Sequence, residues 1–134
     1  MPKTLEKEPP SSLERSFPPE SRSASAARKF VLGAGWSDDD DVNLRLATVV
    51  SEIVTNAILH ARTAFLVTVL TTGETIRVAV RDKSADLPIR RLYHDLQPTG
   101  RGLQIIEALA DRWGVAKEPE GKTVWFELQR QSVA

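Results

Sequence analysis

The chain has 134 residues and 41% of them are hydrophobic, which is the usual size of one domain with a core of its own. Lys plus Arg and Asp plus Glu both total 18, so the chain lacks the excess positive charge with which proteins bind nucleic-acid backbones. It has no cysteine, which excludes disulfides and thiolate metal sites, and no apolar run approaches the roughly 18 residues that cross a bilayer. We therefore expect a cytoplasmic protein that binds neither nucleic acid nor a membrane.

The first 12 residues are rich in Lys, Glu, Pro and Ser and contain almost nothing to bury. We expect them to be a disordered lead, followed by one domain over residues 13–130. That domain opens with Leu13, Arg15 and Phe17, which alternate with polar neighbours and predict a short edge strand.

Two helices are predicted next. Ser21 and Ser23 can cap a helix that ends near Leu32. The acidic run at 38–41 precedes a longer apolar-periodic segment at 42–61, which predicts the central helix. Carboxylates at that point suit the free N–H groups and the positive dipole end of a helix better than they suit a metal.

The second half of the domain alternates strongly. Two strands are predicted at about 64–70 and 75–81, joined by a tight glycine-containing turn and therefore antiparallel. A third helix is expected over 103–113, and a last strand includes Val124, Phe126 and Leu128. Three helices with about four strands indicate an α/β (α+β) two-layer sandwich, a mostly antiparallel sheet covered on one face by helices.

Three polar residues share one line of the central helix. Glu52, Asn56 and His60 are spaced by four, so each lies about 40° around the axis from the one before. The neighbouring stripes are apolar, which places this line at the border of the core. The line is either a solvated helix edge or part of a binding site, and spacing alone does not decide between them. We expect His60 to be structural.

Asp82 continues the inward parity of the strand that precedes it, because Ile76, Val78 and Val80 share its side. A carboxylate at the edge of a core needs a donor, such as the exocyclic amine of an adenine. The alternative is an ordinary strand-ending Asp in a turn with Lys83 and Ser84.

Gly100, Arg101 and Gly102 precede the third predicted helix. Glycines there leave backbone N–H groups open near the positive end of the helix, which is what phosphate binding requires. A flexible turn that lets the helix pack is equally compatible with a lone Gly-x-Gly.

Taken together, these segments resemble the GHKL (Bergerat) ATPase fold of histidine kinases and gyrase-type enzymes, and most closely the anti-sigma-factor serine kinases. Residues 52–61, EIVTNAILHA, resemble the N box, whose Asn holds Mg²⁺ against the phosphates and whose Glu can act as general base. Residues 80–82 resemble the start of the G1 box, whose Asp receives the adenine amine, and residues 100–103 the phosphate-holding G2 box. Residues 121–124, GKTV, resemble the closing segment whose Thr supports the adenine site.

This resemblance implies the cofactors ATP and Mg²⁺ and a set of site residues. Glu52 is the expected catalytic residue and Asn56 the expected metal ligand. The expected nucleotide-binding residues are Asn56, Asp82, Ser84, Gly100, Arg101, Gly102, Leu103 and Thr123. The G1 box departs from the family pattern Asp-x-Gly-x-Gly, because Ser84 and Asp86 stand where the two glycines are usual.

Three functions remain open from the sequence. The first is a protein-serine kinase of the anti-sigma type that phosphorylates a small antagonist and has a sigma factor or an anti-anti-sigma protein as partner, with a homodimer plausible. The second, motivated by the altered G1 box, is a non-catalytic or weakly nucleotide-binding module that sequesters a sigma factor or another regulator. The third is an ATP hydrolase used as a conformational switch.

Overall fold

The computed structural model describes residues 10–83 and 102–130. Within them the chain forms one sheet in which every neighbouring pair of strands is antiparallel and the strand order is β1-β2-β3-β5-β4. The strands are β1 (Ser11–Phe17), β2 (Phe65–Thr71), β3 (Thr75–Asp82), β4 (Arg112–Glu118) and β5 (Gly121–Gln129). The predicted edge strand and the predicted hairpin of β2 and β3 are therefore confirmed.

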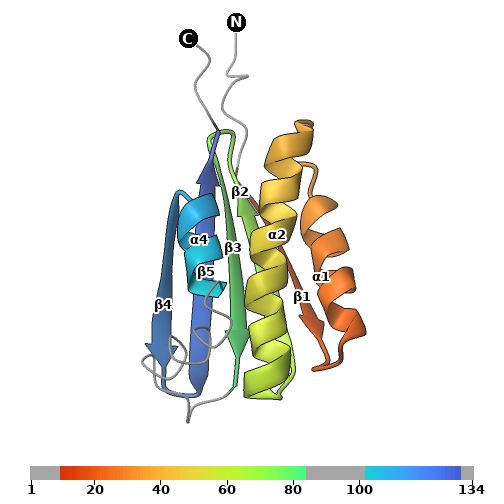
Figure 1. The fold of residues 1–134 in the computed structure, drawn as a ribbon, viewed down its shortest axis with the longest axis vertical. Helices are drawn as coiled ribbons and strands as arrows, with labels where there is room; N and C mark the ends of the chain where they lie inside the picture. Colours follow the sequence, from red (N-terminus) through yellow and green to blue (C-terminus); the bar gives the residue numbers. More distant parts are fainter. Residues whose placement is uncertain (1–9, 84–101, 131–134) are drawn as a thin grey trace, which may run out of the picture.

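The described helices all lie on one face of this sheet (Figure 1). They are α1 (Arg22–Leu32), α2 (Asp40–Asn56) with its continuation η1 (Ala57–Ala61), and α4 (Gly102–Leu109). The central helix, α2, packs against α1 on one side and α4 on the other. The predicted two-layer sandwich is thus confirmed.

The core lies between the helices and the sheet because alternate strand residues point to the same side. From β2 and β3 these are Phe65, Val67, Val69, Ile76, Val78 and Val80, and from α2 they are Leu46, Val49, Val50, Ile53 and Val54, all at most 3% exposed. Burying each such side chain contributes roughly 1.5–3 kcal/mol. This packing fixes where α2 lies against β3 and hence which of their polar residues can meet.

The start of α2 is capped as expected. One carboxylate oxygen of Asp39 accepts hydrogen bonds from the backbone N–H groups of Asp41 and Val42, at 2.8 and 3.1 Å. At α1 the capping differs, because Ser21 makes no side-chain capping bond and the Ser23 hydroxyl donates to the carbonyl of Pro18 instead, at 2.7 Å.

The helix from Asp40 to Ala61 is, by length and composition, the single described segment that could span a membrane. No such segment was expected from the sequence. Within this fold its apolar side covers the sheet, since Leu46, Val50 and Ile53 are buried there. The apolar character of the helix follows from this central position.

The prediction for residues 103–113 is wrong in its second half. The third helix ends at Leu109, and Arg112–Glu118 is strand β4, which raises the described strands from about four to five. The helix ends because the residues that follow it form hydrogen bonds with strand β5. The N–H of Asp111 donates to the carbonyl of Glu127 at 2.9 Å, and the Asp111 carboxylate accepts from the N–H of Gln129 at 2.6 Å.

The long predicted helix at 42–61 also changes character near its end. After Asn56 it becomes a π-helix, in which the N–H of Arg62 donates to the carbonyl of Ala57, five residues earlier. Arg62 then adopts a left-handed conformation with φ of 60° and ends the helix. Single π turns in helices are frequent at functional sites.

Candidate functional site

The structure brings Asn56 and Asp82 to one small cavity. Helix α2 with η1, strand β3 and strand β5 all contribute to its wall. Its lining residues are Ile53, Asn56, Ala57, His60, Val80, Asp82, Lys122 and Val124. Three segments that are far apart in the chain therefore meet at this point.

Asp82 points into the layer between sheet and helices, as its strand parity predicts, and only 2% of the residue is exposed. Its carboxylate is paired. Oδ2 lies 2.6 Å from Nζ of Lys122, and both side chains are 3% exposed. The two residues stand directly opposite each other in the register of β3 and β5. A charged pair this deep is strongly coupled, because removing one partner leaves the other charge buried without compensation.

Sequence reasoning missed Lys122, although a signal was present. Val124, Phe126 and Leu128 face the helices, and Lys122 has the same parity along β5. The family resemblance points instead to the Thr that follows the lysine. Parity could have placed Lys122 on the helix side of the sheet, and the register of β3 and β5 then puts its ammonium beside Asp82.

Gly121 holds this end of the two strands together. Its φ is +153°, and a Cβ at this position would lie 1.9 Å from the backbone carbonyl oxygen of Asp82. No other residue type fits there without moving the main chain. The close contact places Lys122 at the level of the Asp82 carboxylate.

Asn56 is oriented by its own helix. Its amide nitrogen donates to the backbone carbonyl of Glu52 at 3.0 Å. That bond uses the amide nitrogen, whereas the amide oxygen is the atom that Mg²⁺ prefers as a ligand. Glu52 lies one turn earlier and is half-buried, but it does not line the cavity.

Thr123 lies away from Asp82. It has the opposite parity to Lys122 along β5, so it belongs to the sheet face that the described helices leave uncovered. Its hydroxyl donates to Glu118 at 3.2 Å, and Glu118 in turn pairs with Arg81 at 3.0 Å. At the position beside Asp82 the structure has Lys122, not Thr123.

The remaining expected residues belong to the G1 and G2 segments. Ser84, Gly100 and Arg101 lie outside the described residues. Gly102 and Leu103 form the first turn of α4, which packs on α2. The described part of the G2 segment is therefore a helix start, as predicted.

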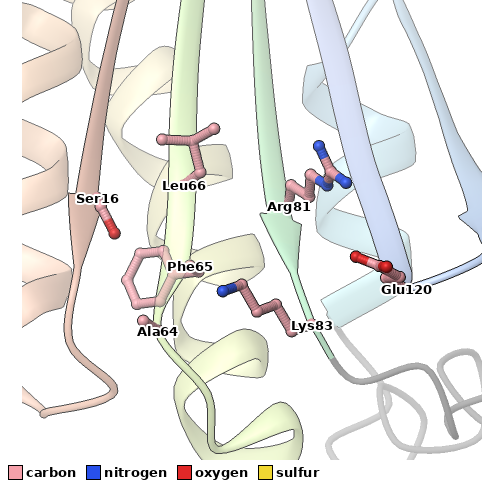
Figure 2. A pocket seen from close by; sticks show the side chains of 7 residues that line it. All are labelled: Ser16, Ala64, Phe65, Leu66, Arg81, Lys83 and Glu120. Carbon is pink, nitrogen blue, oxygen red and sulfur yellow. The ribbon is translucent and has the colours of Figure 1, made fainter.

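A larger hollow, of about 250 Å³, is on the uncovered face of the sheet (Figure 2). It is lined by Ser16, Ala64, Phe65, Leu66, Arg81, Lys83 and Glu120. Figure 2 shows Leu66 and Arg81 on the side of the sheet opposite the helices, and these two residues alternate in parity with Asp82. The sheet itself separates this hollow from Asn56 and the ion pair.

Comparison with known proteins identifies the family. The sequence profile of the histidine kinase-like ATPase domain matches residues 17–128. The chain belongs to this family. Its fold is similar to that of a crystal structure of the RsbU and RsbW domains of Rv1364c from Mycobacterium tuberculosis, with a TM-score of 0.67 and 20% sequence identity. That match covers 93% of this chain and 34% of the other, so the chain spans about a third of the length of that protein. A comparison with curated protein sequences finds no match.

A histidine kinase-like ATPase domain implies a nucleotide, usually with Mg²⁺, and the described residues fit the two ends of such a ligand differently. The amide oxygen of Asn56 is of the kind that fits a metal ligand. Within residues 10–83 and 102–130 the base end is not open. The cavity beside Asp82 has a volume of about 10 Å³, room for about one water, whereas small-molecule sites measure roughly 300–1,000 Å³. The carboxylate that would receive an adenine amine already receives the ammonium of Lys122.

Proposed function

We propose that this chain is an ATP-binding regulatory protein of the anti-sigma-factor kinase type, which transfers phosphate from ATP to a serine of a small antagonist protein. The observation that supports the proposal is the convergence of Asn56 and Asp82 on one cavity in a domain of the histidine kinase-like ATPase family. The similarity to a structure that contains an RsbW domain supports the same branch. A cytoplasmic location is part of the proposal.

In this proposal each site residue has a role that follows from its position. Asn56 helps to hold Mg²⁺ through its amide oxygen, and Glu52, one helical turn away, accepts the proton of the incoming serine hydroxyl. The backbone N–H groups at the start of α4, with Gly102 among them, hold phosphate oxygens at the positive end of the helix dipole. The serine oxygen takes the γ-phosphoryl group of ATP, whose bond to the β,γ-bridging oxygen breaks, and ADP leaves.

The proposed partners are proteins. A sigma factor and an anti-anti-sigma protein are the two expected classes, and we expect neither nucleic acid nor a membrane. The balance of 18 basic and 18 acidic residues supports this choice, because it leaves no net charge for a phosphate backbone. A homodimer is compatible with the proposal.

The second candidate is a non-catalytic or weakly nucleotide-binding module that sequesters a sigma factor or another regulator. The buried pair of Lys122 and Asp82 favours it, because a lysine now takes the place expected for the base. The missing glycines at Ser84 and Asp86 point in the same direction.

Calorimetric titration with Mg-ATP, together with thermal unfolding, separates the two candidates. A ligand present at 100 times its Kd stabilises the folded state by about 2.7 kcal/mol, so binding is visible as a rise in Tm. If Mg-ATP produces no heat and no rise in Tm, the kinase proposal is overturned and the non-catalytic module remains. Steady phosphate release without any protein substrate would indicate the third function, an ATP hydrolase.

A further inference from the structure

The Lys122 side chain is directed toward β3 by charges on both of its neighbouring strands. In register, Lys122 stands between Asp82 of β3 on one side and Lys117 of β4 on the other. Like charges directly opposite each other repel, and opposite charges attract. Lys117 is exposed, whereas the Lys122 ammonium lies 2.6 Å from the Asp82 carboxylate and is 3% exposed. The ion pair of Lys122 and Asp82 therefore follows from the register of the three strands.

The ammonium and an adenine amine are chemically alike in this position. Both are N–H donors, and an ionised carboxylate only accepts. In the described part of the chain, Asn56, His60 and aliphatic side chains line the space beside the pair, which has room for about one water. Lys122 takes one oxygen of the Asp82 carboxylate and neutralises its charge, so a base that used Asp82 would compete with the ammonium for the carboxylate and for the space beside it.

We propose that Lys122 is an internal competitor of the nucleotide base, which holds the base end of the site closed by pairing with Asp82. The inference rests on the proposed function to the extent that an adenine nucleotide is the ligand. It goes further in naming the residue that controls affinity for the base. Base binding at Asp82 requires the Lys122 side chain to leave, so the phosphates and Mg²⁺ provide the affinity of the unmodified chain and the base adds little.

The test is the affinity for Mg-ATP of the full chain and of Lys122→Ala, measured by calorimetry. The expected result is a gain of at least about tenfold in Lys122→Ala, the factor that one hydrogen bond to a charged group contributes. This direction is opposite to the general electrostatic effect, since loss of a positive charge near a triphosphate weakens binding. Equal or weaker binding by folded Lys122→Ala would overturn the inference.

The matched control is Lys117→Ala. It removes the same charge from the neighbouring strand at the position in register with Lys122, but Lys117 is exposed and is not part of the cavity. Its affinity for Mg-ATP is expected to equal that of the unmodified chain or to fall. A gain of the same size in Lys117→Ala would also overturn the inference, because the effect would then be independent of the ion pair.

A second measurement needs no variant and applies even if Lys122→Ala does not fold. The unmodified chain is titrated with Mg-ATP and with Mg-GTP. Similar affinities for the two are expected while Lys122 covers the carboxylate, and binding of ATP that is tighter by about tenfold or more would overturn the inference. Failure of the proposed function looks different, because neither the unmodified chain nor folded Lys122→Ala would then bind any nucleotide.

Discussion

Asp82 and Gly121 touch through their main chains at the end of β3 and the start of β5. The backbone carbonyl oxygen of Asp82 occupies the space in which a Cβ of residue 121 would lie, at a distance of 1.9 Å. The two strands are therefore closer here than any side chain allows. Lys122 follows Gly121 directly in the chain, so this main-chain contact lies next to the ion pair between Asp82 and Lys122.

Gly121→Ala is expected to destabilise the domain by about 3 kcal/mol or more, because it adds both a main-chain overlap and a residue at positive φ. The control is Gly35→Ala, at a position with φ of +67° where an added methyl group would meet nothing within 4 Å. That change carries only the conformational cost, about 1–2 kcal/mol. Urea unfolding measures both, and equal losses in the two variants would contradict the overlap.

The buried ion pair predicts strong coupling between two substitutions. Asp82→Asn or Lys122→Met alone leaves one charge buried without its partner, with an expected loss of about 3–5 kcal/mol. The double variant replaces both charges by neutral groups of similar size and is expected to be more stable than either single variant. The free energies of unfolding from urea titrations form the cycle. Additive losses would show that the two charges do not depend on each other.

Glu52→Ala tests the proposed base. Phosphate transfer to the partner serine is expected to fall by about 10²–10⁴-fold, the usual contribution of a positioned general base, while Mg-ATP still binds. Transfer is followed with labelled ATP and binding by calorimetry. Glu107→Ala, at an exposed position on α4, is the control and should leave both unchanged. Undiminished transfer by Glu52→Ala would rule out this assignment.

Arg130 ties three segments together beyond the end of β5. Its guanidinium donates to the carbonyls of Gly73, at 2.8 Å, and Trp36, at 2.7 Å, and lies 4.3 Å from the centre of the Trp36 ring. Arg130→Ala is expected to lower the free energy of unfolding by about 1–2 kcal/mol. Arg22→Ala serves as the control, because that side chain is 84% exposed, and it should change stability by less than about 0.5 kcal/mol. A loss no larger than that of the control would contradict the role of Arg130.

The sequence predicted the secondary structure correctly in those segments whose residue pattern fits only one type of element. Strict alternation identified β2 and β3, and the acidic run located the start of α2, where Asp39 is the cap. Strand β4 was missed because Trp113 fits the helical spacing of the preceding residues and the alternation of the following ones equally well. What decides is the pairing of Asp111 with β5, a contact between residues far apart in the chain that local periodicity does not contain.

The sequence led us to expect Asn56 and Asp82 near one cavity, but it did not reveal the pairing of Asp82 with Lys122. The direction of Asp82 followed from strand parity, and the meeting of Asn56 and Asp82 followed from the family resemblance. The partner of Asp82 depends on the register between β3 and β5, which sequence motifs do not reveal. That register sets Lys122 opposite Asp82, whereas Thr123 has the opposite parity and lies on the other face of the sheet.

The π turn after Asn56 has a consequence for how this helix tolerates changes in length. The hydrogen bond of a π turn joins residues five apart, whereas that of an α turn joins residues four apart. The loss of one residue within 57–61 would therefore convert this turn into ordinary α-helix. The part of α2 that precedes the turn is anchored by its buried stripe and would keep its register against the sheet. The turn thus allows a one-residue deletion in this stretch without moving the amide of Asn56 against the sheet.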